Sequence, residues 1–84
     1  MQVLLVEDEP AIAVLLTDLL EAKGAVVTVT TTALEALQVL NKQCPQILVC
    51  NLRLPDLDGR QWLEQVRQAP NTGIRQLPAI AVTS

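Results

Sequence analysis

Residues 2–24 read QVLLVEDEPAIAVLLTDLLEAKG, and the change of pattern within them indicates the class of fold. Gln2–Val6 is a short apolar run rich in β-branched residues, which is typical of a strand covered on both faces. Three acidic residues follow, and Pro10 then stands where proline is favoured, at the first position of a helix. Apolar residues next recur at helical spacing until Gly24 ends the helix: Ile12, Leu15, Leu16, Leu19 and Leu20. The segment therefore predicts a strand, an acidic turn and a helix.

The same alternation of strand and helix continues along the chain. Thr32 with Glu35 forms a capping box for a second helix, and Asp58 is a suitable N-cap for a third. The further elements expected are a strand at 25–30, a helix from 33 to about 41, a strand at 47–50, a helix from about 59 to 68, a loop at 70–78 and a strand at 79–82. Strands that alternate with helices through short connections form a mainly parallel sheet with helices on its faces.

Composition narrows the classes of function. With 84 residues, the chain is long enough for one domain and too short for two. Its net charge of −3, its lack of Lys/Arg clusters and its single aromatic residue, Trp62, argue against nucleic-acid binding. Trp62 is better explained as a packing partner of Leu57 at the start of a helix. The apolar runs are too short to cross a bilayer and a signal peptide is not evident, so we expect a cytoplasmic protein without membrane contact.

Residues needed for common catalytic sites are missing from the sequence. There is no His, and the two cysteines, Cys44 and Cys50, are six residues apart, so zinc sites and His-based catalysis lack ligands or a base. We expect both cysteines to be free thiols that serve as small buried or half-buried side chains. An enzyme that used Glu7 and Asp8 to hold Mg²⁺ would have no identifiable nucleophile or general base, so we expect no enzymatic activity.

Polar residues follow three of the four predicted strands. Glu7 and Asp8 follow the first strand, Asn51 the third and Thr83 the fourth. The carboxyl ends of parallel strands meet at one edge of the sheet, where such folds place their chemistry, so we expect these residues to converge. Adjacent carboxylates are hard oxygen ligands of the kind that hold Mg²⁺. Acidic residues are also favoured at a helix start by the helix dipole, so the convergence, more than the acids alone, indicates a magnesium site.

These residues and the loop Asn51–Gly59, which reads NLRLPDLDG, resemble the receiver domain of two-component response regulators over all 84 residues. The resemblance implies a flavodoxin-like (CheY-like) α/β fold with four parallel strands in the order second, first, third, fourth. It implies that Glu7 and Asp8 bind Mg²⁺ and that the backbone carbonyl of Arg53 is a further ligand. It also implies that Thr83 is the switch hydroxyl that contacts a phosphoryl group. The implied partners are a histidine kinase or phosphotransfer protein and an output domain.

Two departures from the receiver pattern change the expected chemistry. Asn51 stands where receivers carry the Asp that accepts the phosphoryl group, and an amide cannot act as that nucleophile. The loss of one carboxylate charge also leaves a weaker Mg²⁺ site, with Asn51 at most a weak ligand. Receivers further continue through a fourth helix, a fifth strand bearing a Lys and a fifth helix. We therefore expect residues 1–84 to form a single, incomplete receiver domain that lacks the last third of the family fold.

Two functions remain open. The first is a receiver module of a two-component phosphorelay that is not phosphorylated at its usual site. The alternative is a protein–protein interaction module that uses the receiver scaffold without phosphoryl chemistry. In that case the edge of the strand at 79–82, or the uncovered face of the helix that begins at Pro10, would bind a partner or a second copy of the chain.

Overall fold

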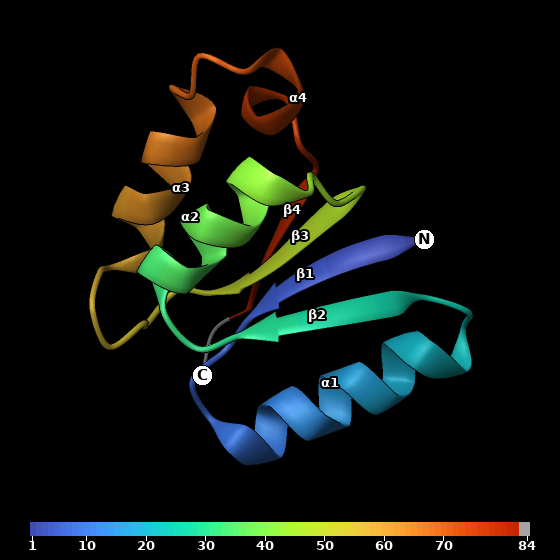
Figure 1. Cartoon of the computed structure of the whole chain (residues 1–84). Coiled ribbons are helices and arrows are strands. Elements are labelled where there is room, and N and C mark those ends of the chain that lie inside the picture. The colour runs from blue at the N-terminus through green and yellow to red at the C-terminus, as the bar shows by residue number, and fades with distance from the viewer. Residues whose placement is uncertain (83–84) are drawn as a thin grey trace.

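The computed structural model describes residues 1–82 of the chain, in which a four-stranded sheet carries helices on both faces (Figure 1). Thr83 lies outside the described residues. The strands are β1 (Gln2–Val6), β2 (Val26–Thr30), β3 (Ile47–Asn51) and β4 (Ala79–Val82). The helices are α1 (Pro10–Ala22), α2 (Ala33–Lys42), α3 (Gly59–Arg67) and α4 (Thr72–Arg75).

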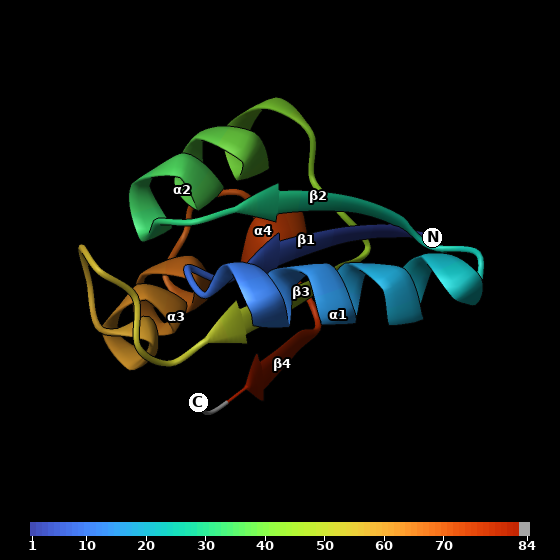
Figure 2. The same ribbon diagram turned by 90° about the horizontal axis from the view of Figure 1, so that it is seen from below.

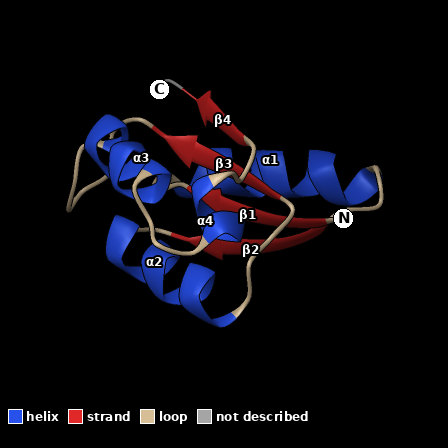
Figure 3. Cartoon of the chain, turned by 90° about the horizontal axis from the view of Figure 1, so that it is seen from above, coloured by secondary structure: helices blue, strands red, loops and turns tan. Residues whose placement is uncertain are grey.

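Every pair of neighbouring strands is parallel, and the strands lie in the order β2-β1-β3-β4. Both the predicted fold class and the predicted strand order are therefore confirmed. Helix α1 lies on one face of the sheet, and α2, α3 and α4 lie on the other (Figure 3). Among residues 1–82, no helix combines the length and the apolar character that a membrane span requires.

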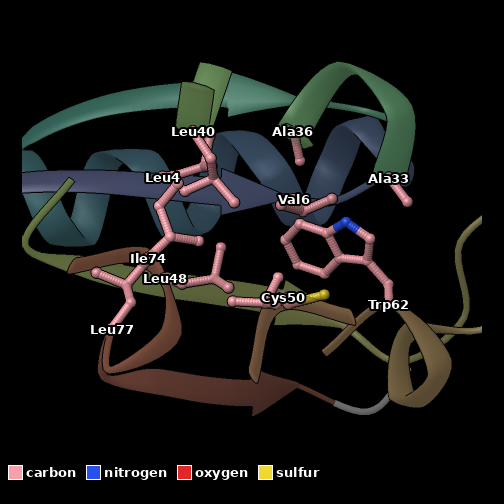
Figure 4. Close-up of a cluster of buried hydrophobic side chains, with 11 residues drawn as sticks. Leu4, Val6, Ala33, Ala36, Leu40, Leu48, Cys50, Trp62, Ile74 and Leu77 are labelled. Carbon is pink, nitrogen blue, oxygen red and sulfur yellow. The ribbon is translucent and has the colours of Figure 1, made fainter. Parts of the chain in front are cut away.

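The core is divided by the sheet because alternate residues of a strand point to opposite faces. From β1, Leu4 and Val6 point into a large cluster beneath α2, α3 and α4, whereas Val3 and Leu5 point into a small cluster beneath α1. Figure 4 shows the large cluster, in which the ring of Trp62 lies beside Val6. Its buried members are Leu4, Val6, Ala33, Ala36, Leu40, Leu48, Cys50, Trp62, Val66, Ile74 and Leu77.

Both helix starts predicted from capping residues are confirmed. The Thr32 side chain accepts a hydrogen bond from the Glu35 N–H at 3.1 Å at the start of α2. The Asp58 side chain accepts one from the Arg60 N–H at 2.8 Å at the start of α3. Trp62 is fully buried in the cluster against which Leu57 packs, so its structural role is confirmed as well.

The loop predicted at 70–78 is partly wrong, because it contains the short helix α4. The side chain of Asn71 caps this helix by accepting from the Ile74 N–H at 3.2 Å. Ile74 and Leu77 are both buried in the large cluster, and Arg67 of α3 donates to the Leu77 carbonyl oxygen at 2.6 Å. One helical turn is too short to produce a periodic pattern, so contacts with distant residues define it.

The apolar stripe of α1 is only partly buried. Leu16 and Leu20 pack against the small cluster, whereas Leu15 and Leu19 are 58% and 54% exposed. Among the described residues, α1 is the single helix on this face of the sheet, as the view from its side shows (Figure 2). Ile80 of the edge strand β4 is 52% exposed. An apolar surface thus remains open around α1 and β4.

Helix α3 begins so close to the end of β3 that only glycine fits. A Cβ atom added to Gly59 would lie 2.5 Å from the Asn51 carbonyl oxygen and 2.6 Å from the Leu52 Cα. The Gly59 N–H also donates to the Leu52 carbonyl oxygen at 2.9 Å. Because the atoms in the way belong to the backbone, they cannot move without displacing the end of the strand.

We therefore expect Gly59→Ala to lower the free energy of unfolding by about 1 to 3 kcal/mol, the usual cost of overpacking. Urea unfolding followed by the fluorescence of Trp62, the one aromatic residue in the sequence, measures this directly. Gly73→Ala is the matched control, because a Cβ there would meet only a side-chain atom, Asn71 Oδ1, at 3.2 Å. Equal stability of the two variants would show that the approach at Gly59 is not close.

Candidate functional site

The carboxyl ends of β1 and β3 bring Glu7 and Asn51 together. Val6 of β1 is paired with Cys50 of β3, so the residues that follow lie at the same edge of the sheet. The Glu7 N–H extends the pairing with β2 by donating to the Thr30 carbonyl oxygen at 2.9 Å. Glu7 and Asn51 are only 1% and 2% exposed, so this polar pair is enclosed by the protein.

Both ends of the Asn51 amide are hydrogen bonded. Its Nδ2 donates to Glu7 Oε2, and its Oδ1 accepts from the Arg53 N–H at 2.8 Å. Glu7 Oε2 also accepts from the Glu9 N–H at 3.3 Å. The side chain of Asn51 therefore links the end of β1 to the start of the loop that follows β3.

The other carboxylate oxygen of Glu7 has a different environment. Glu7 Oε1 is buried and has no hydrogen-bond partner among the described residues. Asp8 follows directly and is exposed. The Arg53 backbone is fixed nearby through the Asn51 side chain and through an isolated antiparallel bridge with Asp58.

The thiol of Cys50 lies directly before Asn51 in β3 and is buried. Burial raises the pKa of Cys50 to about 12, and the negative charge of Glu7 adds to the increase. Because the thiolate is the reactive form of cysteine, this residue is not a nucleophile at neutral pH. Both cysteines are free, as expected, and Cys50 is buried as expected, but the expected burial of Cys44 is wrong because its side chain is exposed.

The loop between β3 and α3 is attached to helix α2 by Asp56. Asp56 Oδ1 accepts from the Ala33 N–H at 2.9 Å, and Asp56 Oδ2 accepts from the Leu34 N–H at 3.0 Å. With the Thr32 cap, three N–H groups in the first turn of α2 are satisfied. The loop that carries Arg53 is thereby held against a neighbouring helix.

Comparison with known proteins identifies the family. The family model described as response regulator receiver domain matches residues 3–84. The chain belongs to this family. An uncharacterised 14.6 kDa protein of Leptolyngbya boryana is 40% identical to it over 84 residues, which are all of this chain and 63% of that protein.

Solved receiver domains share the fold. The signal receiver domain of a signal transduction histidine kinase from Syntrophus aciditrophicus superposes with a TM-score of 0.90 at 27% identity, covering 98% of this chain and 61% of that one. The receiver domain of the sensor histidine kinase PA1611 from Pseudomonas aeruginosa gives a TM-score of 0.87 at 29% identity, covering 95% and 64%. That domain holds a magnesium ion in its active site cleft. The chain thus spans less than two thirds of the length of each of these receivers.

The residues at this site include oxygen donors of the type that a hydrated magnesium ion takes, whereas the Asn51 oxygen already accepts a hydrogen bond. The carboxylates of Glu7 and Asp8 and the carbonyl of Arg53 are hard oxygen donors, and the unpartnered Glu7 Oε1 is a buried acceptor. Asn51 faces Glu7 with its N–H₂ group, and its oxygen is used by Arg53. Among residues 1–82, no group of three or more His, Cys, Asp or Glu side chains is placed so that it could hold a metal ion. Water would therefore supply the remaining ligands.

The role of Asp56 could not be predicted from the sequence. Its hydrogen-bond partners are 23 and 22 residues away along the chain, so local spacing around Asp56 could not indicate them. The capping box at Thr32 was visible locally, but it accounts for only one N–H of the α2 start. The only indication of this contact in the sequence was that an acidic loop could lie near the N-terminus of another helix.

The hydrogen bond from the Ala33 N–H, supported by the one from Leu34, lowers the pKa of Asp56 below its ordinary value of 3.8. A carboxyl group whose pKa is lower in the folded state stabilises the fold above its unfolded pKa. That stability is lost as the pH falls from about 3.8 through the lower folded value. We therefore expect Asp56→Asn to lose less stability than the natural chain on acidification through this range.

Urea unfolding at a series of pH values between neutral and strongly acidic tests this expectation. Asp18→Asn on the exposed side of α1 is the matched control, because it removes a carboxylate at a position that makes no such contact with α2. Parallel pH dependences of Asp56→Asn and the natural chain would contradict the attachment of the loop through Asp56.

Proposed function

We propose that the chain is a receiver module of a two-component phosphorelay that takes no phosphoryl group at Asn51. The observation that supports this is the state of the Asn51 amide. Phosphoryl transfer to a side chain requires a nucleophilic oxygen anion, and Asn51 offers a neutral oxygen already bonded to the Arg53 N–H. The nitrogen of the same amide donates a hydrogen bond to the Glu7 carboxylate.

Nearby acids are poorly placed to replace the missing acceptor. Both carboxylate oxygens of Asp56 accept backbone hydrogen bonds from α2. Asp58 caps α3 through the Arg60 N–H. Phosphoryl transfer to Asp56 would break its contacts with the start of α2, and transfer to Asp58 would break the cap of α3. This supports a receiver without a phosphoryl acceptor.

We further propose that Mg²⁺ binds weakly through Glu7, Asp8 and the backbone carbonyl of Arg53. When bound, the ion would neutralise negative charge at the mouth of the site. Thr83 remains our candidate for the switch hydroxyl. A histidine kinase or phosphotransfer protein and an output domain are the proposed partners, because they are the partners of the family to which the chain belongs.

Incubation with acetyl phosphate and Mg²⁺ followed by intact-protein mass spectrometry tests the central proposal. We expect no species heavier by one phosphoryl group, because the nucleophile is absent. A receiver of the same family that carries Asp at this position, treated in the same tube, confirms that the reagent is active. A stoichiometric phosphoryl adduct within residues 51–58 would overturn the proposal.

A second candidate function is an interaction module that uses the receiver scaffold. The exposed leucines of α1, Leu15 and Leu19, and the exposed Ile80 of the edge strand β4 favour it. In the described part of the chain, β4 pairs with β3 on one side only. Its other edge therefore presents unpaired backbone groups.

On this reading, we expect the 84-residue chain to self-associate and Ile80→Lys to weaken the association, because a charge on an edge strand opposes strand pairing. Light scattering after size-exclusion chromatography at several concentrations measures this. Leu34→Lys is the control, since Leu34 is also exposed but lies on α2, on the opposite face. A natural chain that is monomeric at every concentration would exclude this second function for the isolated chain.

A further inference from the structure

The contact between Glu7 and Asn51 involves a carboxylate that is buried in the protein. A buried carboxylate is costly unless hydrogen-bond donors or a cation compensate its charge. At 1% exposure, Glu7 has little access to water. Two donors reach its Oε2: the Asn51 N–H₂ group and the more distant Glu9 N–H at 3.3 Å. Asn51 is therefore the principal side-chain partner of this carboxylate.

The neighbours of Asn51 fix which way its amide points. Glu7 Oε2 is an acceptor, and the Arg53 backbone N–H is a donor. If the amide were turned over, its oxygen would face the carboxylate and its N–H₂ group would face the N–H. Both contacts would then be repulsive in a buried site. Only the observed orientation satisfies both neighbours.

An aspartate at position 51 would satisfy only one of the two neighbours, the Arg53 N–H. Its carboxylate could still accept from the Arg53 N–H, but its second oxygen would face Glu7 Oε2 in place of the N–H₂ group. Two buried carboxylates in contact require a shared proton or a cation between them. The amide of Asn51 removes that requirement, because it is neutral and donates toward Glu7.

We propose that the Asn51 amide takes the charge-compensating place of a divalent cation, so that β1 and β3 are joined at the site without a metal ion. A cation bound at Glu7 Oε1 and Asp8 would add to this arrangement but would not hold it together. The inference concerns folding stability and does not depend on whether any group of the chain accepts a phosphoryl group.

Thermal unfolding of the natural chain and of Asn51→Asp, each in a chelator and in millimolar Mg²⁺ at matched ionic strength, tests the proposal. We expect the Tm of Asn51→Asp in chelator to be lower by about 5 °C or more. Its Tm should rise steadily with the logarithm of the Mg²⁺ concentration, because the cation binds the folded state. The natural chain should respond much less.

Asn71→Asp is the matched control, since it adds the same charge at the exposed cap of α4, where an aspartate can still accept from the Ile74 N–H. We expect it to behave like the natural chain. A natural chain whose Tm rises with Mg²⁺ as much as that of Asn51→Asp would overturn the proposal. So would an Asn51→Asp variant as stable in chelator as the natural chain.

A double variant settles the case in which Asn51→Asp does not fold. Glu7→Gln combined with Asn51→Asp exchanges donor and acceptor, so that the side chain at position 7 donates to the one at position 51. We expect this exchange to restore a folded chain and to remove the dependence of Tm on Mg²⁺. The N–H₂ group introduced at position 7 also faces the Glu9 N–H, so the double variant is compared with Asn51→Asp alone. A double variant no more stable in chelator than Asn51→Asp would overturn the proposal.

Discussion

The register between β1 and β3 is the constraint on which the rest of this receiver depends. Pairing of Val6 with Cys50 sends Leu4 and Val6 into the large cluster and sets Glu7 beside Asn51. A slip of one residue would turn every side chain of the strand to the other face of the sheet. The burial of aliphatic side chains therefore fixes the position of the polar pair.

Contacts of the loop after β3 connect the paired strands to the helices. Gly59 lets α3 start against the end of β3, and Asp58 caps that helix. Asp56 attaches the same loop to the first turn of α2. The Arg53 N–H joins the loop to the side chain of Asn51. The loop is thus held from both neighbouring helices and from the strand, which explains why a site built on a loop has a defined geometry.

Features encoded by neighbouring residues could be predicted from the sequence, and features created by distant contacts could not. The β1 run, the Thr32 cap and the Asp58 cap each depend on residues a few positions apart, and all three were predicted. Helix α4 depends on burial of Ile74 and on a hydrogen bond from Arg67, so its segment was predicted as a loop. The meeting of Glu7 and Asn51 followed from the parallel topology, but the direction of the Asn51 amide required its partners in three dimensions.

The proposed charge compensation limits what can switch this receiver. A ligand shifts an equilibrium between two conformations only through the difference in its affinity for them. In a site with a carboxylate at position 51, a cation would relieve the repulsion from Glu7 and could supply that difference. Because the Asn51 amide is hydrogen bonded to both Glu7 and the Arg53 N–H, little repulsion remains for a ligand to relieve. A change of state would then be driven from surfaces outside the site, and the apolar surface that remains open around α1 and β4 is one candidate among the described residues.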